Sequence, residues 1–278
     1  MNLSVELLGA AALLAGLVFV WISFRYAWWR RGIPLDHPRI LMYHMVREAI
    51  AGSRYNKLRV APGLFEQQVV WLRRNGWRFV TVSQLANKPR GDKTVAITFD
   101  DGYRDNLLQA LPILKRHDAC MTLYLVADRD AAPDWPAQRK AARAGSDLSG
   151  ETRLNDDEVR EMIASGRVEL GAHSMTHADL TKIDDRRRQI ELCESRTRLE
   201  TLFGVPVHSF CYPFGLFTAK DPQLLRDCGY TTAVTTEPSI VSPEQDDPMH
   251  WPRVKVSGTE GMFAFRLRMR TGRRSLHG

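Results

Sequence analysis

Short apolar runs alternate along the chain with longer segments in which apolar residues recur at helical spacing. The apolar runs cover residues 39–43, 77–82, 94–99, 121–126, 168–172, 208–212 and 230–235, a length typical of strands. Helical spacing or a helix-ending glycine marks residues 62–75, 106–116, 155–165, 183–203 and 221–228, and Pro112 should kink the second of these. Strands that alternate with helices in this way predict βαβ units around a parallel sheet, so the fold class is α/β.

The N-terminal segment has a different pattern. Residues 7–24 contain no charged residue, and 18 helical residues span about 27 Å, close to the thickness of a bilayer's hydrocarbon core. Aromatic and basic residues follow at 25–31, as at a lipid interface. A cleaved signal peptide is the competing interpretation, but residues 1–6 hold no basic side chain and no small-x-small cleavage site precedes Trp28 and Trp29. We predict a membrane anchor over residues 1–31, a catalytic domain over 38–256 and a basic tail over 257–278.

The formal charge of +7 belongs mainly to the two ends of the chain. Residues 1–24 carry −1, residues 25–39 carry +3 and residues 257–278 carry +4, which leaves +1 for residues 40–256. This distribution fits contact with anionic membrane lipids near the anchor. It argues against nucleic-acid binding, because the central region has neither a basic stripe nor a recognised motif.

The strand at residues 94–99 ends in two adjacent carboxylates, Asp100 and Asp101, followed by Gly102. Like charges side by side repel and must be desolvated together, so the chain gains no stability from placing them there. A metal ion would remove the conflict by binding one carboxylate and leaving the other as a base. The alternative is a solvated turn, because Asp-Gly is a common turn dipeptide.

His173 and His177 lie four residues apart, just past the strand at 168–172. Two imidazoles at this spacing can converge on one metal ion, whereas a lone histidine is more often structural. Together with the acidic pair they favour a site of two histidines and one aspartate, with Zn²⁺ as the expected cofactor. Non-haem iron oxygenases use the same donor set, but on an antiparallel β-sandwich that the helix-rich pattern opposes.

Three motifs stand in a fixed order: TFDDGY at residues 98–103, HSMTH at 173–177 and FCYPFG at 210–215. Together they resemble the motifs of the polysaccharide deacetylases (carbohydrate esterase family 4, the NodB-homology domain) across about residues 38–256. The resemblance implies an irregular (β/α)7 barrel, here preceded by one transmembrane helix. It also implies a metal-dependent hydrolase that removes N-acetyl groups from amino sugars.

The resemblance also implies roles for the motif residues. The expected metal ligands are Asp101, His173 and His177, and Asp100 is the expected base. The backbone N–H of Tyr103 is the expected oxyanion donor beside the metal. The expected groove wall against the substrate consists of Tyr212, Pro213 and Phe214.

Two positions depart from the family's usual pattern. The third motif often starts with an arginine that steadies the base, but Cys211 stands there, and Arg253 is the candidate to supply the role. The usual acid histidine near the C-terminal end of the domain has only His277 as a counterpart, in a segment poorly suited to fixed geometry. A branch that deacetylates poly-N-acetylglucosamine carries this histidine on the first strand instead. His44, after the strand at 39–43, resembles that arrangement; the alternative is a histidine hydrogen-bonded within the barrel mouth.

The sequence alone does not determine which glycan is the substrate or on which side of the membrane the catalytic domain lies. An exported polymer of N-acetylhexosamine, peptidoglycan and a lipid-linked precursor all fit, and the basic flank favours an envelope or lipid-linked glycan. Most such deacetylases are exported, yet the arginines after the span would keep the domain cytoplasmic under the positive-inside rule. An inactive sugar-binding module is the alternative function, and Asp100 argues against it, because a binder has no use for a base.

The cysteines and one long insertion give little further information about the function. The four cysteines form no CxxC pair, so a structural zinc site is not expected. Cys193 is expected as a buried thiol, and a disulfide between Cys211 and Cys228 is an option outside the cytoplasm. Residues 127–154 are expected to form an insertion whose Trp135 either stacks on a sugar ring or packs on its own domain.

Overall fold

The computed structural model describes residues 3–86, 93–129, 148, 150–242 and 247–273. Its strands are β1 (Arg39–Tyr43), β2 (Met45–Val46), β3 (Arg59–Val60), β4 (Arg78–Val80), β5 (Thr94–Phe99), β6 (Met121–Leu125), β7 (Val168–Ala172), β8 (Ser209–Cys211), β9 (Thr232–Pro238) and β10 (Trp251–Lys255). Its α-helices are α1 (Leu3–Tyr26), α2 (Pro62–Arg74), α3 (Val82–Ala86), α4 (Leu111–Arg116), α5 (Asp156–Ala164), α6 (Asp185–Gln189), α7 (Ser195–Phe203), α8 (Asp221–Asp227) and α9 (Met262–Thr271).

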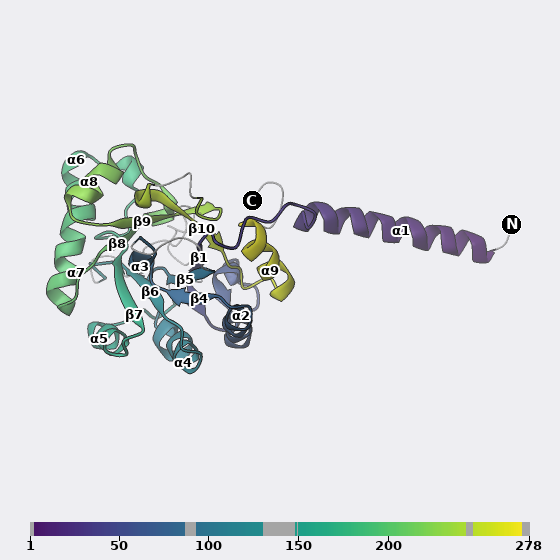
Figure 1. Ribbon diagram of the computed structural model, residues 1–278, viewed down its shortest axis with the longest axis horizontal. Coiled ribbons are helices and arrows are strands. Elements are labelled where there is room, and N and C mark those ends of the chain that lie inside the picture. Colours follow the sequence, from purple (N-terminus) through teal and green to yellow (C-terminus); the bar gives the residue numbers. More distant parts are fainter. Residues whose placement is uncertain (1–2, 87–92, 130–147, 149, 243–246, 274–278) are drawn as a thin grey trace.

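Seven of the described strands close into a parallel barrel. The order around the ring is β1, β10, β9, β8, β7, β6 and β5, and β5 pairs with β1 to complete it. The short β4 pairs with the first residues of β5, on the edge that β6 occupies farther along. Helices cover the outside of the barrel (Figure 1). The predicted α/β barrel is therefore confirmed, and the antiparallel sandwich of the oxygenases is excluded.

The central strands are apolar on both faces because each face is covered. In β1, β5 and β6 every residue is buried. Side chains from alternate positions form two separate clusters: Ile40 and Ala96 pack in one with Tyr124, and Leu41 and Ile97 pack in the larger one with the helices. Continuous apolar runs are what parallel strands buried on both faces require.

The helices follow the predicted pattern, with local changes. Asn155 caps α5 in a capping box with Glu158. Pro112 lies in the first turn of α4, directly after a π-helical turn at Asn106–Ala110, so the predicted kink is a change of helix type. The predicted helix over residues 183–203 is divided into α6 and α7 by a second π-helical turn, Ile190–Glu194, and ends at Gly204 in the left-handed region.

The C-terminal segment differs from the basic tail that the sequence suggested. Helix α9 lies over Met262–Thr271 and buries Ala264, Phe265, Leu267 and Met269. The ring of Phe265 meets that of Trp71 on α2, with centroids 5.9 Å apart. The sequence did not predict this helix, because its arginines alternate with the apolar residues that it buries and so obscure the helical spacing. His277 lies outside the described residues, as does Trp135.

Helix α1 projects from the body as a single apolar rod (Figure 1). Residues Leu7–Tyr26 are long and apolar enough to span a membrane, and none of that stretch is buried against the body. The segment after α1 is tied to α9: Ile33 N–H donates to the carbonyl of Arg270 at 2.9 Å, and the Arg270 side chain donates to the carbonyls of Trp28 and Arg30. The buried Arg39 adds a hydrogen bond to the carbonyl of Met269.

The cysteine pairing differs from the expected option. Cys193 and Cys228 form the disulfide, with Cα atoms 5.1 Å apart, whereas Cys211 is a buried free thiol. The reason is topological: Cys211 ends β8 and lies inside the barrel, while Cys228 follows α8 on the outside, beside the helical run that carries Cys193. The option of a Cys211–Cys228 bond is therefore wrong.

Phe65 of α2 should be a major contributor to stability. Its side chain is fully buried, and its ring meets those of Tyr43 and Phe99 at 5.2 and 5.8 Å. We expect Phe65→Ala to lower the free energy of unfolding by about 3–5 kcal/mol, through lost burial and the cavity left behind. Equilibrium unfolding in urea measures this change. Leu108→Ala removes a side chain that is 54% exposed, and this control should change stability by less than about 0.5 kcal/mol.

Candidate active site

The motif residues meet at one rim because the strands are parallel and in register. Tyr43 pairs with Phe99, and Leu125 pairs with Ala172, at the carboxyl ends of their strands. The next residues on β1, β5 and β7 are therefore His44, Asp100 and His173. In β/α barrels this rim carries the functional side chains, because the loops that leave it are free to vary.

The three expected metal ligands lie together and are buried. Oδ1 of Asp101 is 3.5 Å from Nε2 of both His173 and His177. Nδ1 of His173 donates to the carbonyl of Cys211 at 2.7 Å, which orients the ring so that Nε2 faces Asp101. Burial, followed by the charge of His173, lowers the pKa of His177 to about 3, so its imidazole is neutral as ligation requires.

The donor set fits a divalent cation. One potential ligand atom from each of Asp101, His173 and His177 lies within 4.8 Å of the others. Oδ2 of Asp101 is buried and accepts no hydrogen bond from any described residue. A buried carboxylate oxygen left without a partner is costly, and a bound cation would remove that cost.

A second group of potential ligands consists of Asp100, His173 and Cys211. The guanidinium of Arg253 already occupies it: its two terminal nitrogens donate to the two oxygens of Asp100 at 2.7 and 2.8 Å, and one lies 3.2 Å from the sulfur of Cys211. Burial raises the pKa of the Cys211 thiol, which opposes the thiolate that a metal needs. The group that contains Asp101 is therefore the better metal site.

The structure brings Arg253 to the position expected for it. The side chain is fully buried, and its Nε donates to the carbonyl of Thr235 at 2.8 Å while Nη1 donates to Thr98 Oγ1 at 2.9 Å. Burial alone would raise the pKa of Asp100, but the charge and hydrogen bonds of Arg253 hold that pKa below its usual range. Asp100 is thus an ionised carboxylate of fixed orientation beside the metal site.

His44 also faces the site. It is half-buried at the end of β1, and its carbonyl accepts a hydrogen bond from Asn106 at 3.0 Å. Burial lowers the pKa of the imidazole, while the carboxylates of Asp100 and Asp101 act in the opposite direction. His44 therefore lies close enough to the acidic pair to share its electrostatic field.

The groove wall differs in part from the expectation. Tyr212 is fully buried, with its hydroxyl donating to the carbonyl of Met249 at 2.9 Å, and Pro213 is buried as well. Phe214 is half-buried, and its ring meets that of His177 with centroids 4.7 Å apart. Of these three residues, Phe214 contacts an expected metal ligand and is partly exposed, whereas the side chains of Tyr212 and Pro213 are buried.

Backbone strain is concentrated at this rim. Six described non-glycine residues have positive φ angles, and four of them belong to the motifs: Asp101, Ser174, His177 and Phe214. Each costs of order 1 kcal/mol and persists only where the surrounding structure imposes it. Such strain typically clusters where side chains are held for function rather than for stability.

The comparisons with known proteins agree with this geometry. The model of the polysaccharide deacetylase family matches residues 87–233. The chain belongs to the polysaccharide deacetylase family. Similar proteins include YxkH of Bacillus subtilis, named as a polysaccharide deacetylase, with 28% identity over 224 residues that cover 79% of this chain and 71% of YxkH.

The poly-beta-1,6-N-acetyl-D-glucosamine N-deacetylase of Escherichia coli K12 is 24% identical over 257 residues. The match covers 81% of this chain but only 37% of that protein. Among solved structures, the polysaccharide deacetylase BC0361 of Bacillus cereus has a TM-score of 0.69 at 27% identity, over 84% of this chain and 69% of that one. The deacetylase PplD of Streptococcus pyogenes has a TM-score of 0.71 at 22% identity, over 86% and 99%, and shares the fold.

Sequence reasoning missed Glu191, which fixes the loop of the second motif in this deacetylase. Its carboxylate is fully buried and accepts hydrogen bonds from the N–H of Thr176 at 2.9 Å, the hydroxyl of Thr176 at 2.7 Å and Nε of Arg187 at 2.9 Å. Thr176 directly precedes His177, so this carboxylate holds the loop that positions an expected metal ligand. The only sequence signal was an acidic residue on the apolar face of a predicted helix.

A second missed group lies over the first motif. Glu151 is buried and pairs with the fully buried Arg59 at 2.8 Å, and also with Arg47. The adjacent Arg153 stacks its guanidinium 3.7 Å from the ring centroid of Tyr103. These contacts hold residues 150–154 against the first motif; no pattern in the sequence links positions so far apart.

We expect Glu191→Gln to weaken binding of Zn²⁺ by about tenfold or more without unfolding the chain. Oε1 of Glu191 accepts from the Thr176 hydroxyl and from Arg187, while Oε2 accepts from the N–H of Thr176. In glutamine an NH₂ group replaces one of these oxygens, so at least one of these donors faces another donor. Competition with a chromogenic chelator measures the affinity. Glu194→Gln makes the same charge change at an exposed position of the same π-helical turn. Equal affinities for the two variants would show that Glu191 does not position the ligand loop.

Proposed function

We propose that the chain is a metal-dependent hydrolase that removes N-acetyl groups from amino sugars of an envelope polysaccharide or lipid-linked glycan. Family membership supports the deacetylase activity, and the names of the poly-N-acetylglucosamine relatives support the class of substrate. One observation carries the proposal: a buried carboxylate, Asp100, is held ionised by Arg253 directly beside the Asp101–His173–His177 set. A sugar-binding module has no need of such a base.

Each of the proposed site residues has a separate role in amide hydrolysis. The divalent cation, most simply Zn²⁺, would be held by Asp101, His173 and His177, and would polarise the acetyl carbonyl and lower the pKa of a water molecule. Asp100 takes the proton from the attacking water, and Arg253 keeps its two oxygens in one orientation.

The backbone N–H of Tyr103 is the proposed donor to the oxyanion. It donates to no acceptor among the described residues, because its neighbours make the hydrogen bonds of the local bridge: Leu154 N–H donates to the carbonyl of Gly102, and Arg104 N–H to that of Thr152, each at 2.9 Å. A donor held in place by its neighbours needs no reorganisation when charge develops on the substrate. The leaving amine then takes a proton from His44.

Asp100→Asn tests the assignment of the two carboxylates. We expect turnover to fall by roughly a hundredfold or more, because the amide cannot accept the proton, while the bound Zn²⁺ stays near one per chain. Acetate release and metal analysis on the same preparation measure both quantities. Asp101→Asn is the matched control and should lose the metal as well as the activity. A metal-free but otherwise folded Asp100→Asn protein would mean that the roles are reversed.

The pH dependence tests His44 as the general acid. The acid must be protonated, so activity should fall as the pH rises through its pKa. Because burial lowers that pKa, the alkaline limb should lie at lower pH than for an exposed imidazole, whose pKa is about 6.5. His44→Ala should keep the metal, lose most turnover and flatten the limb.

The control deletes residues 274–278, which removes His277 and leaves α9 in place. This truncation should keep the parent's turnover and pH profile. An inactive truncated enzyme that is folded and metal-loaded, beside an active His44→Ala, would overturn the assignment.

We further propose that α1 is retained as a single-span anchor in the bacterial inner membrane and that the barrel lies on the extracytoplasmic side. The apolar helix with its exposed surface supports the span. The disulfide between Cys193 and Cys228 supports an oxidising compartment, against the positive-inside rule.

Membrane fractionation of the full-length protein should recover it with the membranes, with an N-terminus that precedes residue 25. A reporter active only outside the cytoplasm, fused after Gly278, should be active. A mature N-terminus beyond residue 25 would refute the anchor, and an inactive reporter in a membrane-bound protein would refute the orientation.

A further inference from the structure

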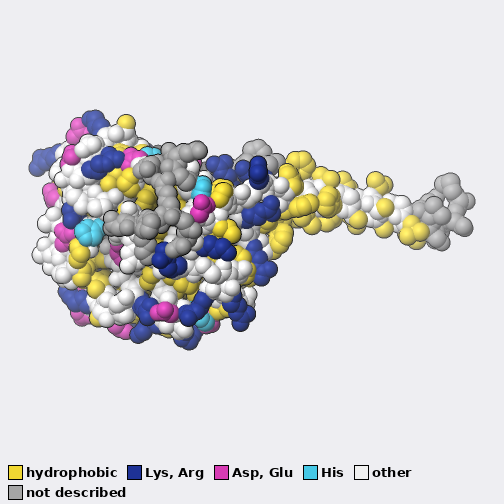
Figure 2. Space-filling view, in the orientation of Figure 1, with side chains coloured by type: hydrophobic (Ala, Val, Ile, Leu, Met, Phe, Trp, Pro, Cys, Tyr) yellow, Lys and Arg dark blue, Asp and Glu magenta, His cyan; other side chains and the backbone are white. Residues whose placement is uncertain are grey.

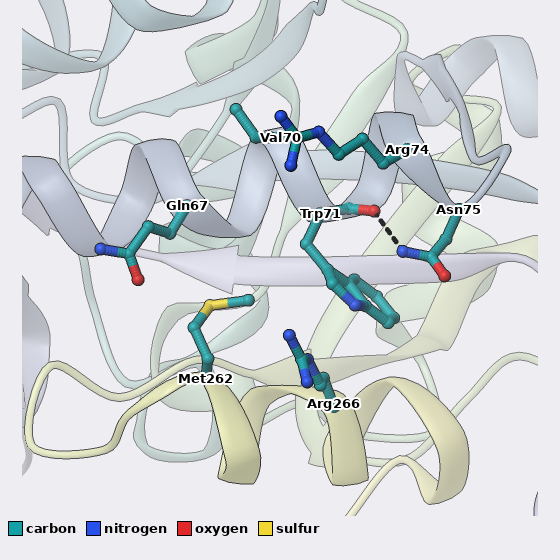
Figure 3. Close-up of a pocket in the computed structure, with 7 residues that line it drawn as sticks. All are labelled: Gln67, Val70, Trp71, Arg74, Asn75, Met262 and Arg266. Carbon is teal, nitrogen blue, oxygen red and sulfur yellow. Dashed lines mark hydrogen bonds between the residues drawn. The ribbon is translucent and has the colours of Figure 1, made fainter.

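A small groove lies between α2 and α9, away from the deacetylase site. Its volume is about 240 Å³, and its lining residues are Gln67, Val70, Trp71, Arg74, Asn75, Met262 and Arg266. Figure 3 shows Met262 and Arg266 extending from α9 towards Trp71 of α2. The floor is apolar, and the polar groups belong to the rim.

The groove is positively charged. Arg74 and Arg266 are exposed, and neither forms an ion pair with a carboxylate of the described residues. No acidic residue lines the groove. The guanidinium of Arg266 lies over the ring of Trp71, 5.9 Å from its centroid, so the cation is held at the edge of the apolar floor. This combination suits a ligand with an anionic group and an adjoining apolar part.

The groove lies beside the base of the apolar helix. Tyr26, the last residue of α1, meets the ring of Phe263 with centroids 5.3 Å apart, and Phe263 directly follows the lining residue Met262. Phe263 is itself 57% exposed. Figure 1 places α9 on the side of the barrel that faces α1, and in Figure 2 Lys and Arg side chains gather where the helix joins the body. If α1 spans the bilayer as proposed, this side of the barrel faces the lipid headgroups.

We propose that the groove binds the headgroup of an anionic phospholipid from the leaflet nearest the barrel. The phosphate contacts Arg74 and Arg266, and the glycerol region lies against Trp71 and Met262. The volume equals that of about eight water molecules in the liquid, which accommodates a headgroup but not acyl chains, so the chains remain in the bilayer beside α1. A protein partner would need a far larger surface than this groove offers. The inference rests on the proposed membrane anchor.

The bound lipid would fix the orientation of the barrel. The connection to α1 is already held by Arg270 and Arg39 on α9 and β1, and a lipid bound by Arg266, one turn before Arg270 on α9, adds a second attachment to the same leaflet. Two attachments set the height and tilt of the catalytic rim above the membrane, whereas one permits rotation about it.

Native mass spectrometry of the full-length chain in detergent, titrated with phosphatidylglycerol or phosphatidylcholine, tests the proposal. We expect one phosphatidylglycerol to bind at least tenfold more tightly than phosphatidylcholine. The double variant Arg74→Ala/Arg266→Ala should reduce this preference to within twofold. The double variant Arg74→Lys/Arg266→Lys, which keeps the charges, should retain most of it.

The matched control is Arg160→Ala/Arg186→Ala, which removes two exposed arginines from α5 and α6, on the opposite side of the barrel from α1 (Figure 1). It should keep the preference of the parent. Equal binding of the two lipids, an unchanged preference in Arg74→Ala/Arg266→Ala, or displacement of the lipid by an equal concentration of glycerol phosphate would each overturn the proposal. Bound lipid is counted independently of acetate release and of cleavage in cells, so a failed anchor or an inactive enzyme is distinguished from an empty groove.

Discussion

The rest of the site depends on two neighbouring carboxylates at the end of one buried strand, because both charges must be neutralised there. Asp100 and Asp101 are 2% and 1% exposed, so neither is solvated by water to any useful extent. The fold neutralises them in different ways. Asp100 receives a fixed cation, the guanidinium of Arg253, while Asp101 receives two imidazoles and retains an oxygen without a partner among the described residues. This asymmetry supports the proposed separation of a base, Asp100, from a metal ligand, Asp101, within one dipeptide.

The barrel makes that separation possible. Parallel register brings the ends of β5 and β7 to the same rim, and the side chain of Arg253 extends to Asp100 from the middle of β10, so residues about 75 and 150 positions from Asp100 converge on it. The strained backbone of Asp101, Ser174 and His177 then aims the side chains inward, and Glu191 holds the second loop from behind. The stability that offsets this strain comes from elsewhere, chiefly from apolar packing such as that of Phe65 between β1, β5 and α2.

Features encoded by residues close together in the sequence could be predicted from it. Contacts between residues far apart in the sequence could not. The strand ending in Asp100, the histidine pair and the helix that starts at Asn155 are encoded by neighbouring residues, and each was predicted. Arg253 was placed by analogy, because the family pattern demanded a cation that Cys211 cannot supply. Glu191 and the partner of Cys193 could not be found, since only the packed fold brings them to their contacts. The burial of Tyr212 was likewise not apparent, because the carbonyl of Met249 that its hydroxyl contacts lies 37 positions away.

In the proposed site, Asp101 binds the metal with His173 and His177, and Asp100 does not. X-ray absorption at the zinc edge of the zinc-loaded full-length chain tests it most directly, because the two candidate groups differ in sulfur. Two imidazole nitrogens and oxygen ligands, all at about 2.0–2.2 Å and without a sulfur scatterer, are the predicted result. A sulfur at about 2.3 Å would place the metal on Cys211 with Asp100 and His173, and would contradict the account.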